Sequence, residues 1–187
     1  RLKVDSLPIV RFLNNIEEQA LLTTLKERDH DLKESRESGN RFRLERGYPL
    51  LETLKRNSFA DRMSPLVIMA LKTGMRRGEL FDLLWQHVSF ENKTITVIAQ
   101  TTKSNKTRYI PLSPIAFDAL KNWNEQSQDL SGRVFPSSAG GRLDNVNNSW
   151  HSILKKAQIE NFRWHDMRHD FASKFVMRGV PLHTVRE

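Results

Sequence analysis

The sequence of 187 residues contains no cysteine. Disulfide bonds, zinc sites made of thiolates and a cysteine nucleophile are therefore excluded, and the absence fits a reducing compartment. Long apolar runs are also missing: the longest candidate is PLVIMAL at 65–71, and the first residues, RLKVDSLP, lack the apolar block of a secretory signal. We therefore expect a cytoplasmic protein without a membrane partner.

Acidic residues are fewer than basic ones. The chain has 30 Lys and Arg against 22 Asp and Glu, a formal net charge of +8, while its 38% of hydrophobic residues is ordinary for a domain with a core. A positive excess favours polyanionic partners through the release of counterions. Many basic surfaces bind nothing in particular, so the charge only favours nucleic acid over other partners.

Apolar periodicity predicts a mainly helical α+β protein. Asn14, with Glu17 three residues later, is placed as the N-cap of a helix over 12–29. The charged stretch 29–46 reads as a solvated loop or a polar helix end. Further helices are expected at 48–59, 64–74, 76–85, 113–127, 146–159 and 165–175.

Between these helices the period changes. The segments VSF, TITVIA and RYIPL alternate or are β-branched, and ENK and TKSNK connect them. We therefore predict a small antiparallel sheet of three strands from Val88 to Leu112.

The segment TGMRRGEL, residues 73–80, is the first of three places that concentrate cationic groups. Gly74 ends one predicted helix, and Arg76 lies in the first turn of the next, where a cation opposes the helix macrodipole. Arg76 and the free N–H groups of the helix start would suit a phosphate. Glu79 could pair with Arg76 or Arg77 and fix its guanidinium. Solvated charge is an equally good interpretation of this segment alone.

The segment TTKSNKTRYIPL, residues 101–112, is a predicted hairpin whose turn carries Lys103, Lys106 and Arg108. Lysines at hairpin tips are usually solvated or protect an edge strand, and alone this segment favours that interpretation. A tip lysine can also reach into a DNA groove, where its ammonium binds phosphate or gives up a proton.

The segment HDMRHDFASKF, residues 165–175, sets His165, Arg168 and His169 on one helical face. The apolar face is formed by Met167, Phe171, Phe175 and Val176. The two histidines have the spacing of metal ligands, but no glutamate of the H-E-x-x-H type accompanies them, so we expect no metal. A histidine beside an arginine joins a proton-transfer group to an anion clamp, as phosphoryl transfer without a metal requires.

Together and in this order, the three segments resemble the tyrosine recombinase, or phage integrase, family. Its catalytic domain has an arginine in a T-G-x-R-x-x-E-L box, a lysine in a β-hairpin and an H-x-x-R box; here they read TGMRRGEL, TKSNKTRYIPL and HDMRH. The resemblance extends from about Leu13 to the end of the chain. It implies an integrase-type catalytic domain over residues 9–187, mainly helical with a small three-stranded antiparallel sheet, after a linker tail at 1–8 from an N-terminal DNA-clamping domain.

The resemblance assigns roles residue by residue. Arg76 matches the first catalytic arginine, with Arg77 as the less favoured register, and Glu79 matches the acidic residue of that box. Lys103 fits the catalytic hairpin lysine better than Lys106.

The H-x-x-R pair corresponds to His165 and Arg168, which are expected to be catalytic, and His169 falls on a supporting position. Three further cations are expected to contact DNA: Arg77, Lys106 and Arg108.

The family reaction is site-specific DNA strand exchange without a metal or other cofactor. By resemblance, a tyrosine hydroxyl attacks a phosphodiester and forms a 3′-phosphotyrosyl link with a free 5′-hydroxyl. Arg76 and Arg168 would hold the non-bridging oxygens, Lys103 would protonate the leaving oxygen, and His165 would transfer a proton or bond a phosphate oxygen. The implied partners are double-stranded DNA and accessory DNA-bending proteins, and the full-length protein is expected to form a tetramer on DNA. It is expected to be encoded by a bacterium or a phage and to be associated with the nucleoid when bound.

The sequence departs from the family at the nucleophile. Its only tyrosines, Tyr48 and Tyr109, precede the H-x-x-R box, and the third box, with a histidine or tryptophan after Leu-Gly, does not occur. We therefore expect a fragment of a longer integrase, monomeric and inactive by itself, that binds DNA weakly. Two alternatives are a type IB topoisomerase-like enzyme and a non-catalytic DNA-binding protein with the same fold.

Overall fold

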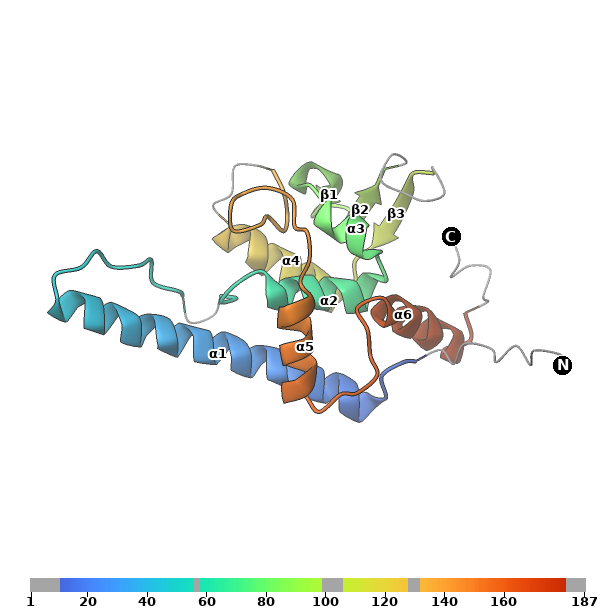
Figure 1. Ribbon diagram of the computed structural model, residues 1–187. Coiled ribbons are helices and arrows are strands. Elements are labelled where there is room, and N and C mark those ends of the chain that lie inside the picture. The colour runs from blue at the N-terminus through green and yellow to red at the C-terminus, as the bar shows by residue number, and fades with distance from the viewer. Residues whose placement is uncertain (1–10, 56–57, 99–105, 128–131, 181–187) are drawn as a thin grey trace, which may run out of the picture.

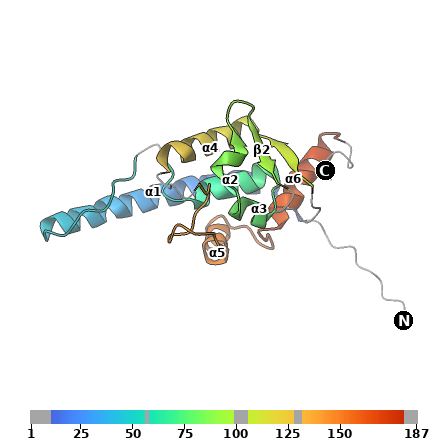
Figure 2. The same cartoon turned by 90° about the horizontal axis from the view of Figure 1, so that it is seen from above.

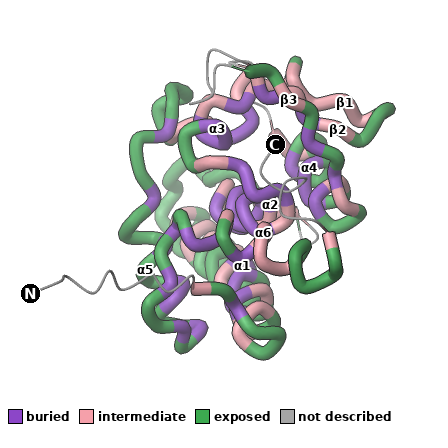
Figure 3. Tube along the Cα trace, turned by 90° about the vertical axis from the view of Figure 1, so that its right-hand side faces the viewer, coloured by how far each residue is buried: buried purple, intermediate pink, exposed green. Residues whose placement is uncertain are grey.

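The most apolar segment of the sequence forms helix α2 (Met63–Thr73), which lies at the centre of the fold. The structure, a computed structural model, describes residues 11–55, 58–98, 106–127 and 132–180 (Figure 1). Every residue of α2 except Ile68 and Lys72 is buried, and Figure 3 shows this buried segment in the middle of the molecule. Each fully buried Leu, Val or Met side chain contributes about 1.5–3 kcal/mol, so α2 supplies a large share of the core.

Four helices surround α2: α1 (Asn15–Glu45), α4 (Pro114–Gln126), α5 (Asn147–Lys156) and α6 (Asp166–Met177). Helices α1, α4 and α6 contact α2 directly, and α5 packs on α1. Figure 2 shows α4 and α5 on opposite sides of α2. No helix in the described residues is long and apolar enough to cross a bilayer.

The predicted sheet is confirmed. Strands β1 (Val88–Ser89), β2 (Thr94–Val97) and β3 (Arg108–Pro111) form one antiparallel sheet in that order. Val88 pairs with Ile95, and Ile95 pairs with Ile110, so one line of apolar side chains crosses all three strands toward the core. The fold class, mainly helical with a three-stranded antiparallel sheet, is as predicted.

Two predicted helix starts are present. The amide N–H of Glu17 donates to Asn14 Oδ1 at 2.9 Å, and the N–H of Asn14 donates back to Glu17 Oε2 at 3.0 Å, a reciprocal capping box. Ser113 caps α4, with Pro114 as its first residue.

The charged stretch 29–46 is a helix end and not a loop. Helix α1 continues to Glu45 and extends beyond the rest of the fold, at the left of Figure 1. The apolar periodicity ends where the helix leaves the core, because the residues beyond have nothing to pack against. Their polar side chains still have good helix propensity.

The prediction of a helix at 48–59 is wrong, because the described residues of this segment are not helical. The side chains of α1 bind the backbone of this segment instead: Asn40 exchanges two hydrogen bonds with Leu51, at 2.8 and 2.9 Å, and Arg36 donates to the Glu52 carbonyl at 2.9 Å. Backbone groups satisfied in this way do not need a helix of their own.

The helix predicted at 76–85 is shorter than expected. Helix α3 (Arg77–Phe81) ends after five residues, and a 3₁₀ turn (Trp85–His87) follows. The intervening backbone bonds to a distant segment: the Trp85 N–H donates to the Gly132 carbonyl at 2.8 Å, and the Val134 N–H donates to the Leu83 carbonyl at 2.9 Å. These long-range bonds replace the next helical turn.

Some apolar residues of the helices are exposed. The relative exposure of Ile16 is 81%, that of Ile115 is 52% and that of Val176 is 42%. Among the apolar residues of α6 only Met167 is fully buried, while Phe171 is half-buried and Phe175 is 37% exposed. Helical periodicity locates an apolar face but not how much of that face a neighbour covers.

A buried carboxylate connects α6 to the start of the chain. Asp170, which is fully buried, accepts the Leu13 N–H at 2.8 Å and a bond from Lys174 at 2.8 Å. Lys174 and Lys72 both donate to Glu18. This network joins α1, α2 and α6, so α6 has a fixed position against α2.

Gly74 ends α2 in the left-handed region, with φ of +61°. An added Cβ atom would lie 2.5 Å from Cδ1 of Phe171 on α6. The glycine therefore permits both the turn after α2 and the close approach of α6.

We predict that Gly74→Ala lowers the free energy of unfolding by about 2–4 kcal/mol, because a left-handed alanine is strained and Phe171 must move. Gly39→Ala is the matched control: Gly39 lies within α1 with nothing within 4 Å of its Cβ position, so that change should stabilise by up to about 1 kcal/mol. Urea unfolding measures both. Equal effects of the two substitutions would contradict the close contact at Gly74.

Candidate functional site

The turn between α2 and α3 brings two predicted catalytic arginines together. Arg76 is the N-cap of α3, immediately after the turn. Arg168, on α6, donates from Nη1 to the Gly74 carbonyl at 2.6 Å. The two arginines come from residues 92 positions apart in sequence, and the Gly74 turn positions both.

A buried glutamate organises this cluster. The Glu79 side chain is only 1% exposed, and its Oε2 accepts the Arg76 backbone N–H at 2.8 Å while its Oε1 accepts Arg76 Nη1 at 3.0 Å. Arg108, on β3, donates from Nη2 to Glu79 Oε2 at 2.6 Å. Among the described residues, Glu79 therefore pairs with Arg76 and not with Arg77.

The hydrogen bonds stabilise the charged form of this carboxylate. Burial by itself raises the pKa of Glu79, but the bonds from Arg108 and Arg76 outweigh burial and hold the pKa below its ordinary value. Charge-assisted bonds from a guanidinium are about twice as strong as neutral ones. Glu79 is therefore ionised, and its two partners are held in fixed orientations.

The arginines outnumber the carboxylate. Burial lowers the pKa of Arg168, and repulsion from Arg76 and Arg108 lowers it further, against the attraction of Glu79. Since arginine stays protonated in proteins, three guanidinium charges face one carboxylate in this part of the described structure. Two positive charges are not neutralised, and an anion bound there would relieve the repulsion.

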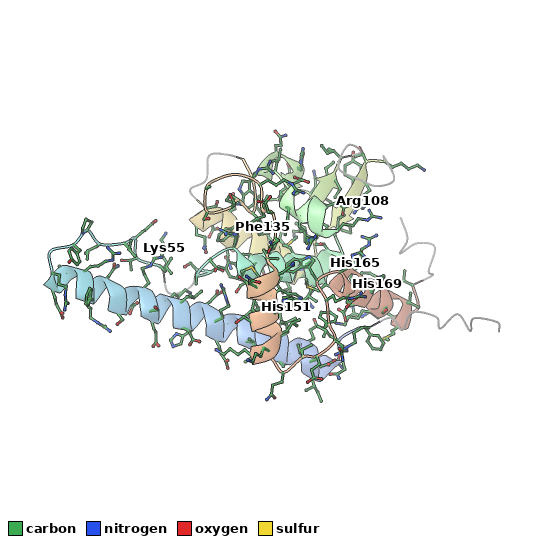
Figure 4. The ribbon with its side chains drawn as sticks, viewed as in Figure 1. Lys55, Arg108, Phe135, His151, His165 and His169 are labelled. Carbon is green, nitrogen blue, oxygen red and sulfur yellow. The ribbon has the colours of Figure 1, made fainter. Side chains whose placement is uncertain are left out.

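The two histidines lie beside the arginines. His165 is the N-cap residue of α6, and its ring centroid lies 5.0 Å from that of His169 in an edge-to-face arrangement. Figure 4 shows both, with Arg108, at the same end of the molecule. Burial lowers the pKa of His165, and the charges of His169 and Arg168 lower it further. Its imidazole is therefore neutral near pH 7 and able to accept a proton.

The hairpin residues are only partly described. Lys103 lies outside the described residues, so its predicted role has no structural counterpart here. Lys106 is exposed just before β3. Arg108 was expected in the turn of the hairpin, but it lies on β3. Its side chain there is 18% exposed and pairs with Glu79.

Arg77 points elsewhere. It is the first residue of α3, is exposed, and makes no ion pair with any residue that the structure describes. It lines a cavity together with His165. The two consecutive arginines therefore point in different directions. Arg76 binds Glu79, and Arg77 lines the neighbouring cavity.

An apolar cavity of about 460 Å³ opens on the other side of the cluster. It lies between β3 and α6, and Arg108 and Arg168 line it together with Tyr109, Phe171 and Phe175. The half-exposed aromatic residues of α6 are therefore walls of this cavity.

The sequence did not predict the role of the Gly74 carbonyl. It accepts the bond that fixes Arg168, and no residue type signals a backbone acceptor. The position of Arg108 was also missed, because only the strand register shows that its side chain reaches Glu79. Among the described residues, no three His, Cys, Asp or Glu side chains are grouped as they would be around a metal ion.

Comparison with known proteins agrees with this geometry. Residues 42–187 match the phage integrase family. The chain is 32% identical to the integrase of Salmonella phage P22, over 68% of this chain and 35% of the phage protein. It is 29% identical to a XerC-like tyrosine recombinase of Caldanaerobacter subterraneus, over 73% of this chain and 44% of that protein. The chain thus spans less than half the length of these two relatives.

Solved structures give the same fold. The crystal structure of XerA recombinase superimposes with a TM-score of 0.67 at 20% identity, covering 94% of this chain and 54% of that one. The catalytic domain of bacteriophage HP1 integrase gives a TM-score of 0.59 at 24% identity, covering 95% and 79%. The fold and the three motifs are those of a tyrosine recombinase catalytic domain. The chain belongs to the phage integrase family, as its motifs predicted.

We predict that Glu79→Gln lowers the free energy of unfolding at pH 7 by about 3 kcal/mol, because it breaks a buried ion pair and leaves the arginines uncompensated. The pKa of Glu79 is depressed in the folded protein, so its contribution is complete above the ordinary glutamate pKa of about 4.3 and is lost as the pH falls through the lower, folded value. As the pH is lowered from 5, the free energy of unfolding of the variant should therefore fall less than that of the wild type.

Urea unfolding at several pH values measures this difference. Glu91→Gln, an exposed carboxylate between β1 and β2, is the control and should change stability by less than about 0.5 kcal/mol. A Glu79→Gln variant as stable as this control would show that the buried pair does not hold the cluster.

Proposed function

We propose that the protein to which this chain belongs is a site-specific DNA recombinase that cleaves and rejoins strands through a 3′-phosphotyrosyl intermediate. One observation carries the proposal: Arg76, Arg108 and Arg168 gather around a single carboxylate and leave positive charge for an anion. A phosphodiester in the transition state of transfer is an anion of this kind. Family membership supplies the reaction class.

The proposed roles are those that the family resemblance assigns, and the positions of the side chains support them. Arg76 and Arg168 bind the non-bridging oxygens of the scissile phosphate, since both guanidiniums are held by other groups and need little reorganisation. His165, with its lowered pKa, transfers a proton or bonds a phosphate oxygen. Lys103 is the proton donor to the leaving 5′-oxygen, a role that rests on the family resemblance alone.

Two residues support these groups. Glu79 orients Arg76 and Arg108 through the bonds described above. His169 lies against His165 and limits its ring orientation. Neither needs to contact DNA.

Double-stranded DNA is the proposed partner. The net charge of +8 favours it, and one structural neighbour, the Tn1549 transposon integrase, was solved in complex with circular intermediate DNA. That neighbour has a TM-score of 0.66 at 16% identity and covers 99% of this chain and 58% of its own. Arg77 and Lys106 are exposed cations for backbone contacts, while Arg108 acts mainly from within the cluster. We further propose assembly as a tetramer on DNA, with accessory DNA-bending proteins.

The nucleophile is not assigned to either tyrosine of this chain. Tyr48 follows the projecting end of α1, and α6 lies at the opposite end of the molecule (Figure 1). Tyr109 is 72% exposed on β3 and lines the apolar cavity with Arg168. Both tyrosines precede the H-x-x-R box, whereas the nucleophile of the family follows it, so a Tyr109→Phe variant of the whole protein should still form the covalent intermediate.

We predict that the whole protein, incubated with a nicked duplex carrying its recombination site, becomes covalently linked to DNA. Arg76→Ala or Arg168→Ala should slow this step by about a hundredfold or more, because each removes a donor to the transition-state charge. Denaturing gel electrophoresis of labelled DNA measures the covalent product, and a metal chelator should not change its yield.

Arg41→Ala is the matched control, since Arg41 is exposed near the end of α1, and it should keep the wild-type rate. Cleavage that requires a metal, or that survives loss of both arginines, would contradict the proposal. Relaxation of supercoiled DNA without joining of two sites would indicate a topoisomerase instead, and binding without any covalent product would indicate a non-catalytic protein.

A further inference from the structure

A second cavity, of about 530 Å³, opens beside His165. Its polar lining comes from three parts of the chain: Arg77 from α3, Asn147 and His151 from α5, and Arg163 from the loop before α6. Figure 4 shows His151 on α5 and His165 at the start of α6. Tertiary folding, not a local motif, brings these residues together.

No acidic side chain lines this cavity. Arg77 makes no ion pair with the described residues, and neither does His151. Two guanidinium groups and two imidazoles therefore share one hollow without a carboxylate in its wall. Arg77 keeps its charge uncompensated there, and the other groups supply hydrogen-bond donors, a composition that favours an anion.

Arg163 is oriented even though its side chain is 84% exposed. Its Nε donates to Asp166 Oδ2 at 3.2 Å and its Nη2 to Asp166 Oδ1 at 3.0 Å. Asp166 is itself 3% exposed and also accepts the Arg163 backbone N–H at 2.7 Å. The Nη1 group has no partner among the described residues, so the guanidinium is held on one edge and has donors left on the other.

The cavity adjoins the arginine cluster. Arg77 follows Arg76 directly in sequence, and His165 lies one turn before Arg168 on the same helix. One member of each pair faces the cluster and the other lines the cavity. A DNA strand carries a phosphate on every nucleotide, about 3.4 Å apart along the helix axis, so a strand fixed at one phosphate presents the next one close by.

We propose that Arg77, His151 and Arg163 bind a second phosphate of the same DNA strand, next to the phosphate held by Arg76 and Arg168. The inference rests on the proposed function, because the first phosphate defines the strand. Two phosphates held at once fix the direction of the strand relative to Arg76 and Arg168. The second site therefore orients the scissile phosphodiester for the catalytic groups.

The test uses the 187-residue chain and a 20-base-pair duplex of arbitrary sequence. The slope of the logarithm of the association constant against the logarithm of salt concentration counts phosphate contacts, at about 0.9 per contact. Arg77→Ala should lower the slope by about one, and Arg163→Ala should do the same. Arg41→Ala should leave the slope unchanged.

Fluorine-labelled tryptophan locates the contact. Trp150 and Trp164 line the cavity, whereas Trp123 is buried against Phe135 elsewhere. Adding the duplex should shift the ¹⁹F signals of Trp150 and Trp164 but not that of Trp123, and Arg77→Ala should reduce those shifts. Because Arg163→Ala also leaves Asp166 without its partner, Arg77→Ala decides the outcome if the Arg163 variant is unstable.

The outcomes separate this inference from the proposed function. A slope that falls for Arg76→Ala and Arg168→Ala but stays unchanged for Arg77→Ala would overturn the second site and leave the recombinase proposal intact. A slope unchanged by all of these substitutions, or no binding to the duplex, would overturn both. Unshifted Trp150 and Trp164 signals at saturation would also overturn the second site.

Discussion

The site depends on the buried carboxylate of Glu79. It joins the start of α3 to strand β3, because it binds Arg76 at 3.0 Å and Arg108 at 2.6 Å while its own side chain is 1% exposed. A charge buried to this degree is tolerated only when hydrogen bonds satisfy it. Arginine suits this role because its guanidinium stays protonated and offers donors in a rigid plane. If either arginine were removed, the remaining hydrogen bonds would no longer offset the free energy of desolvating the carboxylate.

This pairing also explains how positive charge can be concentrated near the core. One carboxylate offsets part of the charge of three guanidiniums, so the cluster keeps an excess of positive charge. Arg168 is held by a backbone carbonyl, which neutralises no charge. A carboxylate in place of that carbonyl would have stabilised Arg168 more strongly and reduced its attraction for phosphate. In the proposed function, the two guanidiniums held in this way bind the scissile phosphate with little reorganisation.

The sequence predicted much of this site and the order of most elements. The three motifs, the three-stranded sheet, the cap at Asn14 and the turn at Gly74 were all recognisable, because each depends on residues close in sequence. The pairing of Arg108 with Glu79 was not, since it depends on the register between β2 and β3. The false helix at 48–59 has a similar cause: Asn40 and Arg36 satisfy that backbone from across a turn. Long-range contacts override local preference, and a single sequence does not show them.

The central claim is that Arg76 and Arg168, positioned by Glu79 and the Gly74 turn, hold the scissile phosphate. A crystal structure of the whole protein bound to a duplex with its recombination site tests this claim most directly. We predict non-bridging oxygens of one phosphate at about 2.7–2.9 Å from both guanidiniums, with the Glu79 bonds to Arg76 and Arg108 still intact. A phosphate bound away from both arginines, or an Arg76 that leaves Glu79 to reach DNA, would contradict it.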